Sequence, residues 1–346
     1  MEGRDDDAIV LGIESTAHTF GVGIVASKPP YILSDVRRNY KPKSGGILPR
    51  EVAQFFSTVA GEAVRTALEE AGVTMRDVDA IAVALGPGMG PALRVGATVA
   101  RALASKYSKP LVPVNHGVAH IEIARFLTGL RDPLALYVSG GTTMVVSYLD
   151  GRYRVFGETL DIALGNLLDT FAREIGIAPP YVVQGRHAVD VCAEKGGFIE
   201  DLPYVVKGQD VSFSGLLTAA IRAVERGLDK ADVCYTLREI SYSSVIEVAE
   251  RGLAHTGKGE FVLTGGVAAS ALLNEKASKM TILHEVKFRR IPPRYAGDNG
   301  VMIALTGLLA YKSGIRPLRP VDAVVRQRWR LDRVDVPWYP MTLGGY

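Results

Sequence analysis

The sequence predicts an α/β protein built from two similar domains. The first half contains three strand-like runs followed by a helix, a strand and a helix. The second half has the same order of predicted elements. A duplicated pattern of this kind indicates two α/β domains facing each other across a cleft, a favoured place for ligands. The chain has 346 residues, 47% of them hydrophobic and 22% charged, which is enough for two ordinary globular domains.

The first half opens with short apolar runs joined by tight turns, which predict an antiparallel meander. A long helix follows, with Pro at its start and Gly72 just past its end, both favourable at those positions. A strand, a turn rich in Gly and Pro, a helix and a further strand complete this half. The predicted strands are 9–14, 21–26, 31–36, 80–85 and 111–114, and the predicted helices are 49–71 and 93–107.

The second half repeats the order with further helices inserted. Its predicted strands are 134–139, 144–148, 153–156 and 261–263, and its predicted helices are 166–175, 213–226, 231–255 and 299–312. Residues 178–185 contain two prolines and no periodicity, so we expect a loop there. The hinge is expected at 128–133, which divides the chain into an N-terminal domain of 1–129 and a C-terminal domain of 130–346 with a basic tail.

Composition excludes several classes of protein. No apolar run reaches the roughly 20 residues that span a bilayer. Three consecutive aspartates at 5–7 do not match the basic start of a signal peptide. Cys192 and Cys234 give neither a disulfide framework nor zinc-ribbon spacing. We therefore expect a cytoplasmic protein without a membrane partner.

The net charge of +3 does not by itself indicate a nucleic-acid partner, but the basic residues are clustered. Such clusters could neutralise phosphates or form a solvated face, and the sequence leaves both readings open. One cluster comprises Lys287, Arg289, Arg290 and Arg294, and the other Lys312, Arg316, Arg319, Arg326, Arg328, Arg330 and Arg333.

A histidine pair is the most informative local feature. His116 and His120 are four residues apart on a predicted helix that Asn115 can cap, so both imidazoles lie on one face. They could hold one metal ion, or they could be ordinary helix residues. The zinc-protease motif H-E-x-x-H has a general base where this chain has Gly117, so the protease reading lacks its catalytic group.

Several strands end in turns of Gly, Ser and Thr, at 13–16, 138–143 and 263–267. Backbone N–H groups at such turns can cradle a phosphate, although no P-loop pattern is present. Asp298 precedes the last helix, where it could cap that helix or complete a two-histidine, one-carboxylate metal set. Asp169 and Asp190 could accept hydrogen bonds from ribose hydroxyls or simply face solvent.

Six motifs resemble one family, the tRNA threonylcarbamoyladenosine transferases in their archaeal and eukaryotic form, the catalytic subunit of the KEOPS complex. The match runs in order and at similar spacing from about Ile9 to Trp338. The motifs are GIESTAHT at 12–19, NHGVAH at 115–120, LYVSGGT at 136–142, FSGLLT at 213–218, TGGVAA at 264–269 and GDN at 297–299. The resemblance implies duplicated ribonuclease H-like domains of the actin/Hsp70/sugar-kinase (ASKHA) type, in agreement with the duplicated pattern.

The resemblance also implies roles for individual residues. His116, His120, Tyr137 and Asp298 match metal ligands, and Glu14 matches an acidic residue near the reacting groups. The substrate and nucleotide positions are matched by Tyr137, Val138, Ser139, Gly140, Gly141, Asp169, Gly185, Asp190 and Ser270.

The chain departs from the family pattern around the nucleotide. Residues 181–186 replace a Pro-Gly-Gly-Pro turn, which brings in Val182 and Arg186 and makes the match of Gly185 loose. Asp190 stands where Glu is usual and Ser270 where Asn is usual. Phe55 and Phe56 replace a His-His pair that often follows the Pro-Arg-Glu of 49–51.

The activity implied is transfer of threonylcarbamoyl from threonylcarbamoyl adenylate to N6 of the adenosine beside a tRNA anticodon, position 37, with release of AMP. The implied cofactors are Fe²⁺, with Zn²⁺ as the alternative, and an adenine nucleotide, the adenylate or ATP with or without Mg²⁺. The implied partners are tRNA and KEOPS subunits, among them a small kinase/ATPase and a dimerising subunit. The rival readings are a non-catalytic or ATP-hydrolysing scaffold, a metalloprotease, and a sugar or acid kinase of the same fold.

Overall fold

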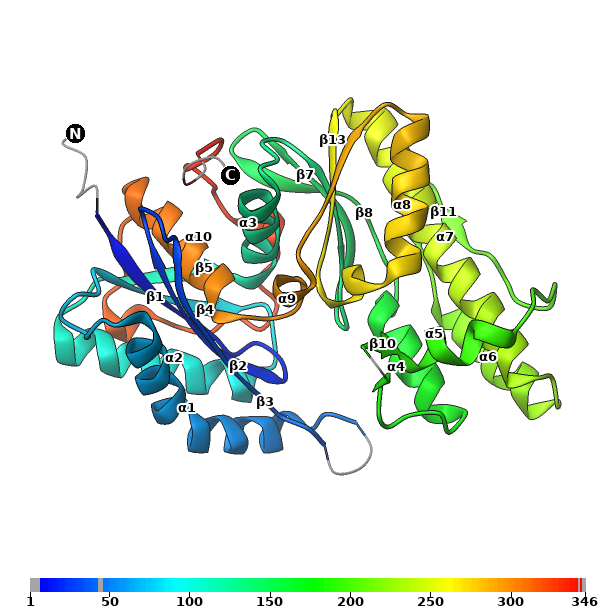
Figure 1. Ribbon diagram of the computed structural model, residues 1–346, viewed down its shortest axis with the longest axis horizontal. Helices are drawn as coiled ribbons and strands as arrows, with labels where there is room; N and C mark the ends of the chain where they lie inside the picture. The colour runs from blue at the N-terminus through cyan, green and yellow to red at the C-terminus, as the bar shows by residue number, and fades with distance from the viewer. Residues whose placement is uncertain (1–6, 43–45, 184, 342, 344–346) are drawn as a thin grey trace. The chain divides into compact units, whose positions relative to one another are not determined.

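A computed structural model describes residues 7–42, 46–183, 185–341 and 343 (Figure 1). Its contacts divide the chain into two compact units. The described residues of 1–131, 149–153 and 298–346 form the first unit, and those of 132–148 and 154–297 form the second. The sequence places the described residues of 298–346 in the C-terminal domain of 130–346, whereas their contacts group them with the first unit.

The first unit contains a five-stranded sheet of order β3-β2-β1-β4-β5. Its first three strands pair antiparallel, which confirms the predicted meander, and β4 and β5 extend the sheet in parallel. The strands are β1 (Ile9–Glu14), β2 (Thr19–Ala26), β3 (Ile32–Asn39), β4 (Ala80–Gly86) and β5 (Leu111–Asn115).

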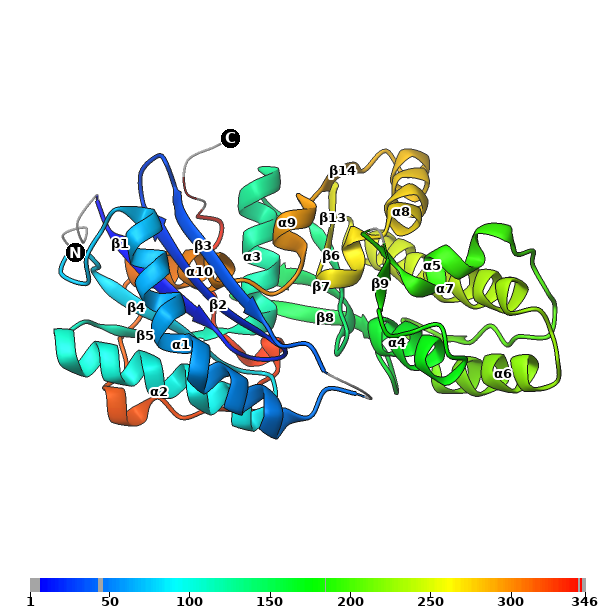
Figure 2. The same cartoon turned by 60° about the horizontal axis from the view of Figure 1, so that its bottom comes forward.

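Helices α1 (Pro49–Ala71) and α2 (Gly90–Tyr107) cover one face of this sheet, as Figures 1 and 2 show. Helix α1 ends where the sequence predicts, with Gly72 in the left-handed conformation at φ 65°. Phe56 points inward from α1, and its ring lies edge-on to Phe20 with centroids 5.4 Å apart. The departure from the family pattern at this position therefore serves the hydrophobic core.

Helix α10 (Gly300–Lys312) packs on the sheet from the opposite side, next to α3 (His116–Thr128). The approach is so close that a Cβ on Gly12 would lie 2.2 Å from the backbone nitrogen of Ala304, and one on Gly23 2.4 Å from that of Val301. Residues 300–310 are all buried. A helix that is apolar on every side belongs in a core. The close approach to Gly12 and Gly23 places this one in the core of the first unit, although it comes late in the sequence.

The second unit repeats the topology of the first. Its sheet has the order β14-β13-β6-β7-β8, with β6 antiparallel to β7 and parallel to β13, and β13 parallel to β14. The strands are β6 (Leu134–Val138), β7 (Thr143–Leu149), β8 (Arg152–Glu158), β13 (Glu260–Thr264) and β14 (Lys287–Arg290). The duplicated α/β architecture predicted from the sequence is confirmed.

Four longer helices build the core of this unit: α4 (Leu164–Glu174), α6 (Ser214–Glu225), α7 (Lys230–Thr256) and α8 (Ala271–Leu283). Several shorter elements complete it. They are β9 (Val182–Val183), β10 (Arg186–His187), α5 (Ala188–Cys192), β11 (Val206–Lys207), β12 (Asp210–Val211) and α9 (Pro293–Ala296), together with 3-10 turns.

Two sequence expectations fail in the second unit. Residues 178–185 are not all loop, because β9 and β10 form a small antiparallel pair. Cys192 and Cys234 are joined by a disulfide that links α5 to α7, their Cα atoms 5.9 Å apart. The two cysteines are 42 positions apart in the sequence, and only the packing of the two helices brings the thiols together.

Among the described residues, no helix is both long enough and apolar enough to cross a membrane.

Candidate metal centre

The histidine pair lies at the start of α3, where strand β5 ends. The side chain of Asn115 accepts hydrogen bonds from the backbone N–H of Gly117 (3.0 Å) and of Val118 (3.1 Å), which is the predicted N-cap. His116 and His120 occupy one face of the helix, with ring centroids 4.7 Å apart. His120 is fully buried and His116 nearly so. Local sequence alone therefore aligns the two imidazoles.

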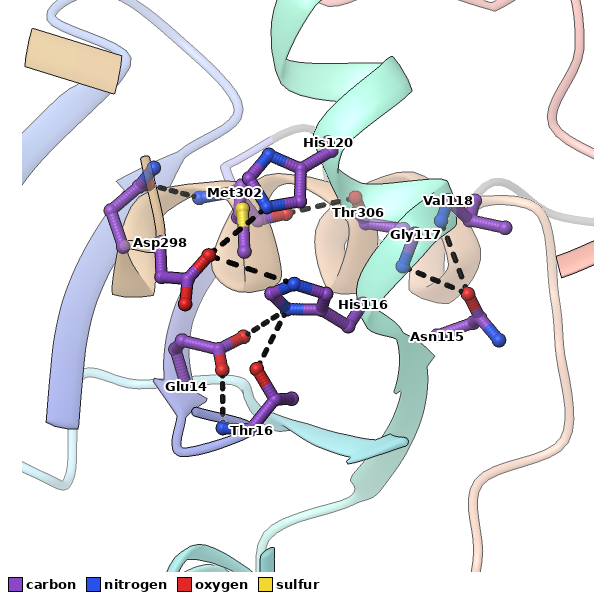
Figure 3. A network of polar contacts seen from close by, with 11 residues as sticks. Glu14, Thr16, Asn115, His116, Gly117, Val118, His120, Asp298, Met302 and Thr306 are labelled. Carbon is purple, nitrogen blue, oxygen red and sulfur yellow. Dashed lines mark hydrogen bonds and ion pairs between the residues drawn. The ribbon is translucent and has the colours of Figure 1, made fainter. Parts of the chain in front are cut away.

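Asp298 meets both histidines from the segment before α10. Its Oδ1 lies 3.2 Å from Nε2 of His120 and 3.6 Å from Nε2 of His116 (Figure 3). The cap of α10 is Asn299, which accepts from the N–H of Met302, so the capping role considered for Asp298 belongs to its neighbour. One donor atom of each of the three residues lies within 4.8 Å of the others.

This donor set fits a divalent metal. Two imidazole nitrogens and one carboxylate oxygen are the set that Fe²⁺ sites use while leaving positions open, and Zn²⁺ accepts the same ligands. Among the described residues, these three form the one group of three or more His, Cys, Asp or Glu side chains whose ligand atoms lie close enough to share an ion. The predicted set of His116, His120 and Asp298 is thus assembled within the first unit alone.

Glu14 contacts the ring nitrogen of His116 that faces away from Asp298. It is completely buried at the end of β1, and its Oε2 lies 2.9 Å from Nδ1 of His116. The backbone N–H of Thr16 donates to its other oxygen at 2.5 Å, and Oγ1 of Thr16 lies 3.1 Å from the same imidazole nitrogen (Figure 3). A carboxylate that accepts a hydrogen bond from Nδ1–H fixes the tautomer and leaves Nε2 for a metal. Glu14, expected near the reacting groups, therefore contacts His116, one of the three residues that could hold the ion.

The charges of this cluster alter its acid–base properties. Burial opposes protonation of His116, but the negative charges of Glu14 and Asp298 outweigh it and raise the His116 pKa to about 9. Burial lowers the pKa of His120. Burial also opposes ionisation of Asp298, yet the charge of His116 and the hydrogen bond with His120 hold the Asp298 pKa below its ordinary value. The site therefore favours positive charge, as a cation site should.

Gly117 has a packing role at the position where a zinc protease carries its glutamate. A Cβ on Gly117 would lie 3.3 Å from Cδ2 of Leu331 and 3.4 Å from Oδ1 of Asn115. This side of the helix faces buried protein instead of the three ligand atoms. The geometry thus agrees with the sequence argument against proteolysis.

The predicted substrate loop lies in the second unit, after β6. Tyr137 and Val138 are buried in the strand, whereas Gly140 and Gly141 are exposed. The carbonyl oxygens of Ser139 and Gly140 accept from the N–H groups of Gly165 and Asn166, both at 3.1 Å, which holds the loop against the start of α4. The role of Tyr137 as a metal ligand stays a prediction, because Tyr137 belongs to the second unit.

The remaining predicted nucleotide residues form two small groups in the second unit. Asp190 and Ser270 both interact with the hydroxyl of Tyr242, which lies 3.5 Å from Oδ1 of Asp190. Burial raises the pKa of Asp190. Gly185 connects β9 to β10 with φ at 79°, a left-handed value that favours glycine.

Asp169 forms the other group with His187, a residue that sequence reasoning did not select. Nδ1 of His187 accepts from the N–H of Val189 at 3.1 Å, so its Nε2 donates to Oδ1 of Asp169 at 3.0 Å. His187 thereby orients the carboxylate. The position of His187 between Gly185 and Asp190, two residues already matched to the nucleotide, was the signal available in the sequence.

The first basic cluster also falls in the second unit. Lys287, Arg289 and Arg290 are exposed on the edge strand β14, and Lys287 forms an ion pair with Glu260 at 3.3 Å. Exposed charges are common on edge strands because they discourage pairing with other chains.

Comparison with known proteins identifies close relatives. The sequence model of the tRNA N6-adenosine threonylcarbamoyltransferase family matches residues 31–305. A protein with that name from Aeropyrum pernix is 70% identical over 341 residues, covering 99% of this chain and 97% of the relative. Another from Hyperthermus butylicus is 62% identical over 339 residues, covering 97% and 93%.

Solved structures of other proteins resemble this chain in fold. HypF of T. kodakarensis is similar with a TM-score of 0.61 and 17% identity, over 88% of this chain and 47% of HypF. An activator of 2-hydroxyisocaproyl-CoA dehydratase from Clostridium difficile, solved with ADPNP, gives a TM-score of 0.50 at 13% identity, over 87% and 94%. Together with the duplicated topology, these likenesses confirm the predicted α/β fold of the actin/Hsp70/sugar-kinase type.

Proposed function

The chain belongs to the tRNA N6-adenosine threonylcarbamoyltransferase family, and on this premise we propose how its residues carry out the transfer. It is a transferase that modifies tRNA, moving a threonylcarbamoyl group to N6 of an adenosine. We assign the adenosine to position 37, beside the anticodon, and the donor to threonylcarbamoyl adenylate. The observation that carries the proposal is the buried cluster of His116, His120 and Asp298, backed by Glu14, in a chain 70% identical to a named relative.

The bond changes follow from the donor's chemistry. The N6 nitrogen forms a bond to the carbamoyl carbon, the mixed-anhydride C–O bond to the phosphate breaks, and AMP leaves with that electron pair. The amine gives up one proton to solvent or to a nearby base. Exposed backbone donors of the loop at Gly140 and Gly141 would stabilise the developing negative charge.

His116, His120 and Asp298 would hold the metal, with Fe²⁺ expected and Zn²⁺ as the alternative. A divalent ion bound there supplies Lewis-acid polarisation and orientation of the donor. Glu14 and Thr16 keep the His116 ring in the tautomer that presents Nε2. Tyr137 is proposed as a further ligand.

The adenine nucleotide is assigned to residues of the second unit. Asp169, oriented by His187, would accept the ribose hydroxyls, and Asp190 and Ser270 would contact the nucleoside from the group around Tyr242. The remaining contacts are assigned to Tyr137, Val138, Ser139, Gly140, Gly141 and Gly185. The resident nucleotide is the adenylate or ATP.

We further propose that the protein acts in the cytoplasm with KEOPS subunits, among them a small kinase/ATPase and a dimerising subunit. The modest net charge of +3 supports shared binding of tRNA, because a lone catalytic subunit would need more positive charge to hold so large a polyanion.

The test is a reconstituted transfer reaction. The purified chain, alone and with KEOPS subunits, is incubated with tRNA and threonylcarbamoyl adenylate, and the modified nucleoside and AMP are measured by mass spectrometry. His116→Ala and Asp298→Ala should each lower the metal content and abolish the transfer while the circular dichroism spectrum is retained. His284→Ala, at an exposed histidine on the other unit, is the matched control and should behave as wild type.

Three results would count against the proposal. Unmodified tRNA in every mixture, with ATP hydrolysis intact, would favour the scaffold reading. Full activity in either ligand variant would refute the metal assignment. Metal-dependent cleavage of a protein substrate would revive the protease reading.

A further inference from the structure

The C-terminal basic cluster contains a short exposed run that the proposed function does not explain. We call residues 326–330, Arg-Gln-Arg-Trp-Arg, the arginine segment. Its three arginines and Gln327 are exposed and Trp329 is half-buried. The run belongs to no helix or strand, and the exposure of its arginines places their charges at the surface.

The backbone of the arginine segment is fixed in place. The N–H of Arg326 donates to the carbonyl of Leu85 at 2.7 Å, and the carbonyl of Gln327 accepts from the N–H of Gly88 at 3.2 Å. The following residue, Leu331, is buried. A Cβ on Gly86 would come within 1.9 Å of the Arg326 carbonyl oxygen, so glycine is required at this crossing. The arginine segment therefore packs directly against the Gly/Pro turn of residues 86–91.

Two short routes connect the arginine segment to the metal centre. The side chain of Asn115, which caps α3, donates to the carbonyl of Trp329 at 2.9 Å. The next residue along is His116. On the other route, the N–H of Met89 donates to the carbonyl of Thr16 at 2.8 Å, and the Thr16 hydroxyl contacts His116. The segment thus contacts Asn115 directly, and it reaches Thr16 through the turn residues Gly88 and Met89. Asn115 and Thr16 both position His116.

The charges of the segment are available to a ligand. Of the described side chains, none forms an ion pair with Arg326 or Arg328, whereas Arg330 pairs with Asp332 at 3.1 Å. The Arg326 guanidinium lies over the Trp329 ring at 5.1 Å. Unpaired arginines beside an indole are the combination that binds the phosphates and bases of single-stranded nucleic acid.

We propose that the arginine segment is a contact surface for the tRNA substrate, and that Arg326 and Arg328 bind backbone phosphates of the single-stranded loop next to the target adenosine. This inference rests on the proposed function. A looped-out adenosine exposes its N6 amine, and proteins recognise such unpaired RNA through stacking and phosphate contacts. The anchoring on Asn115, and on Thr16 through Gly88 and Met89, would hold that loop beside the first unit's proposed metal ligands.

The test measures tRNA binding with the whole chain over a range of salt concentrations. The double variant Arg326→Ala/Arg328→Ala should flatten the slope of log affinity against log salt by about 1.4, since each phosphate contact to a single strand contributes about 0.7. At about 0.1 M salt this corresponds to a roughly 25-fold loss of affinity. Arg328→Lys in the Arg326 wild-type background should keep most of the slope, because the charge remains.

The matched control is Arg65→Ala/Arg222→Ala, which removes the same charge from exposed positions on α1 and α6. It should bind tRNA as wild type does. Metal content is measured for every variant and should not change, which separates loss of a contact from disturbance of the Asn115 cap.

Unchanged affinity and slope in the arginine double variant would overturn the inference, as would an equal loss in the control. Equal competition by polyglutamate would show a generic anion surface and would also overturn it. If wild type binds tRNA through these arginines but never modifies it, the proposed function fails and this surface stands. If wild type modifies tRNA and the double variant binds normally, the reverse holds.

Discussion

At the residue scale, the contact between Glu14 and His116 indicates what Glu14 does in the site. The sequence placed it near the reacting groups, and the structure places it completely buried against Nδ1 of His116. A carboxylate in that position increases the basicity of the ligand nitrogen and holds the ring. We therefore expect Glu14 to act first on metal binding.

Glu14→Gln should lower metal affinity by about 10- to 100-fold, because the amide keeps the size of the side chain but loses the charge that supports His116. Titration with Fe²⁺ or Zn²⁺ against a competing chelator measures this directly. Asp79→Asn is the matched control, since Asp79 accepts from the N–H of Ile9 at the far end of β1. Wild-type affinity in Glu14→Gln would contradict the supporting role.

Asp161 gives a pH prediction at the same scale. Burial opposes its ionisation, but hydrogen bonds from Ser212 and from the backbone N–H groups of Phe213, Ser214 and Ile162 outweigh it and lower its pKa from 3.8 to about 2. Because the folded pKa is depressed, the stabilisation is full above the unfolded value and is lost as pH falls through about 2.

The urea midpoint of wild type should therefore exceed that of Asp161→Asn at pH 5, and the two should converge between pH 4 and pH 2. Urea unfolding followed by circular dichroism at each pH measures the difference. A constant gap over the whole range would show that the Asp161 charge contributes nothing.

At the element scale, the sequence placed α3 and its cap correctly because both depend on neighbours along the chain. The caps of α1 and α3 lie where Gly72 and Asn115 predict them. The short elements between residues 178 and 211 were missed, because strands of two residues carry no periodicity. The disulfide between α5 and α7 was missed for a different reason, since it depends on helix packing.

The disulfide predicts a measurable stability. It closes a loop of 42 residues, for which the chain-entropy relation gives about 4 kcal/mol. Adding a phosphine reductant should lower the melting temperature of wild type and leave Cys192→Ser/Cys234→Ser unchanged. Alkylation under denaturing conditions, followed by mass spectrometry, counts the free thiols. Two alkylated cysteines in unreduced protein would refute the bond.

At the scale of the whole molecule, the chain builds each unit from separated segments. Helix α10 comes last in sequence among the long helices, yet it covers β1, β2 and β4 of the first sheet. Gly12 and Gly23 leave the space that this helix fills. The first unit therefore cannot complete its core until residues 298–312 have been added.

A chain ending at residue 297 should lose the structure of the first unit, because it lacks both α10 and Asp298. Hydrogen exchange measured by mass spectrometry should then show unprotected β1 and β4, whereas β6 and β13 keep their protection. The full-length chain provides the reference. Native protection of β1 in the shortened chain would contradict the dependence on α10.

The sequence by itself determined what depends on neighbouring residues and on repeated patterns: the two α/β halves, the meander, most long helices, and the face that His116 and His120 share. Hydrophobic residues recur with a period of 3.6 in helices and 2 in strands, and this period is visible in the sequence. Tertiary structure alone decided the pairing of Cys192 with Cys234, the joining of α10 to the first sheet, and the contact of Glu14 with His116. These join residues 42 to about 300 positions apart, and such contacts arise only when packing closes the chain on itself.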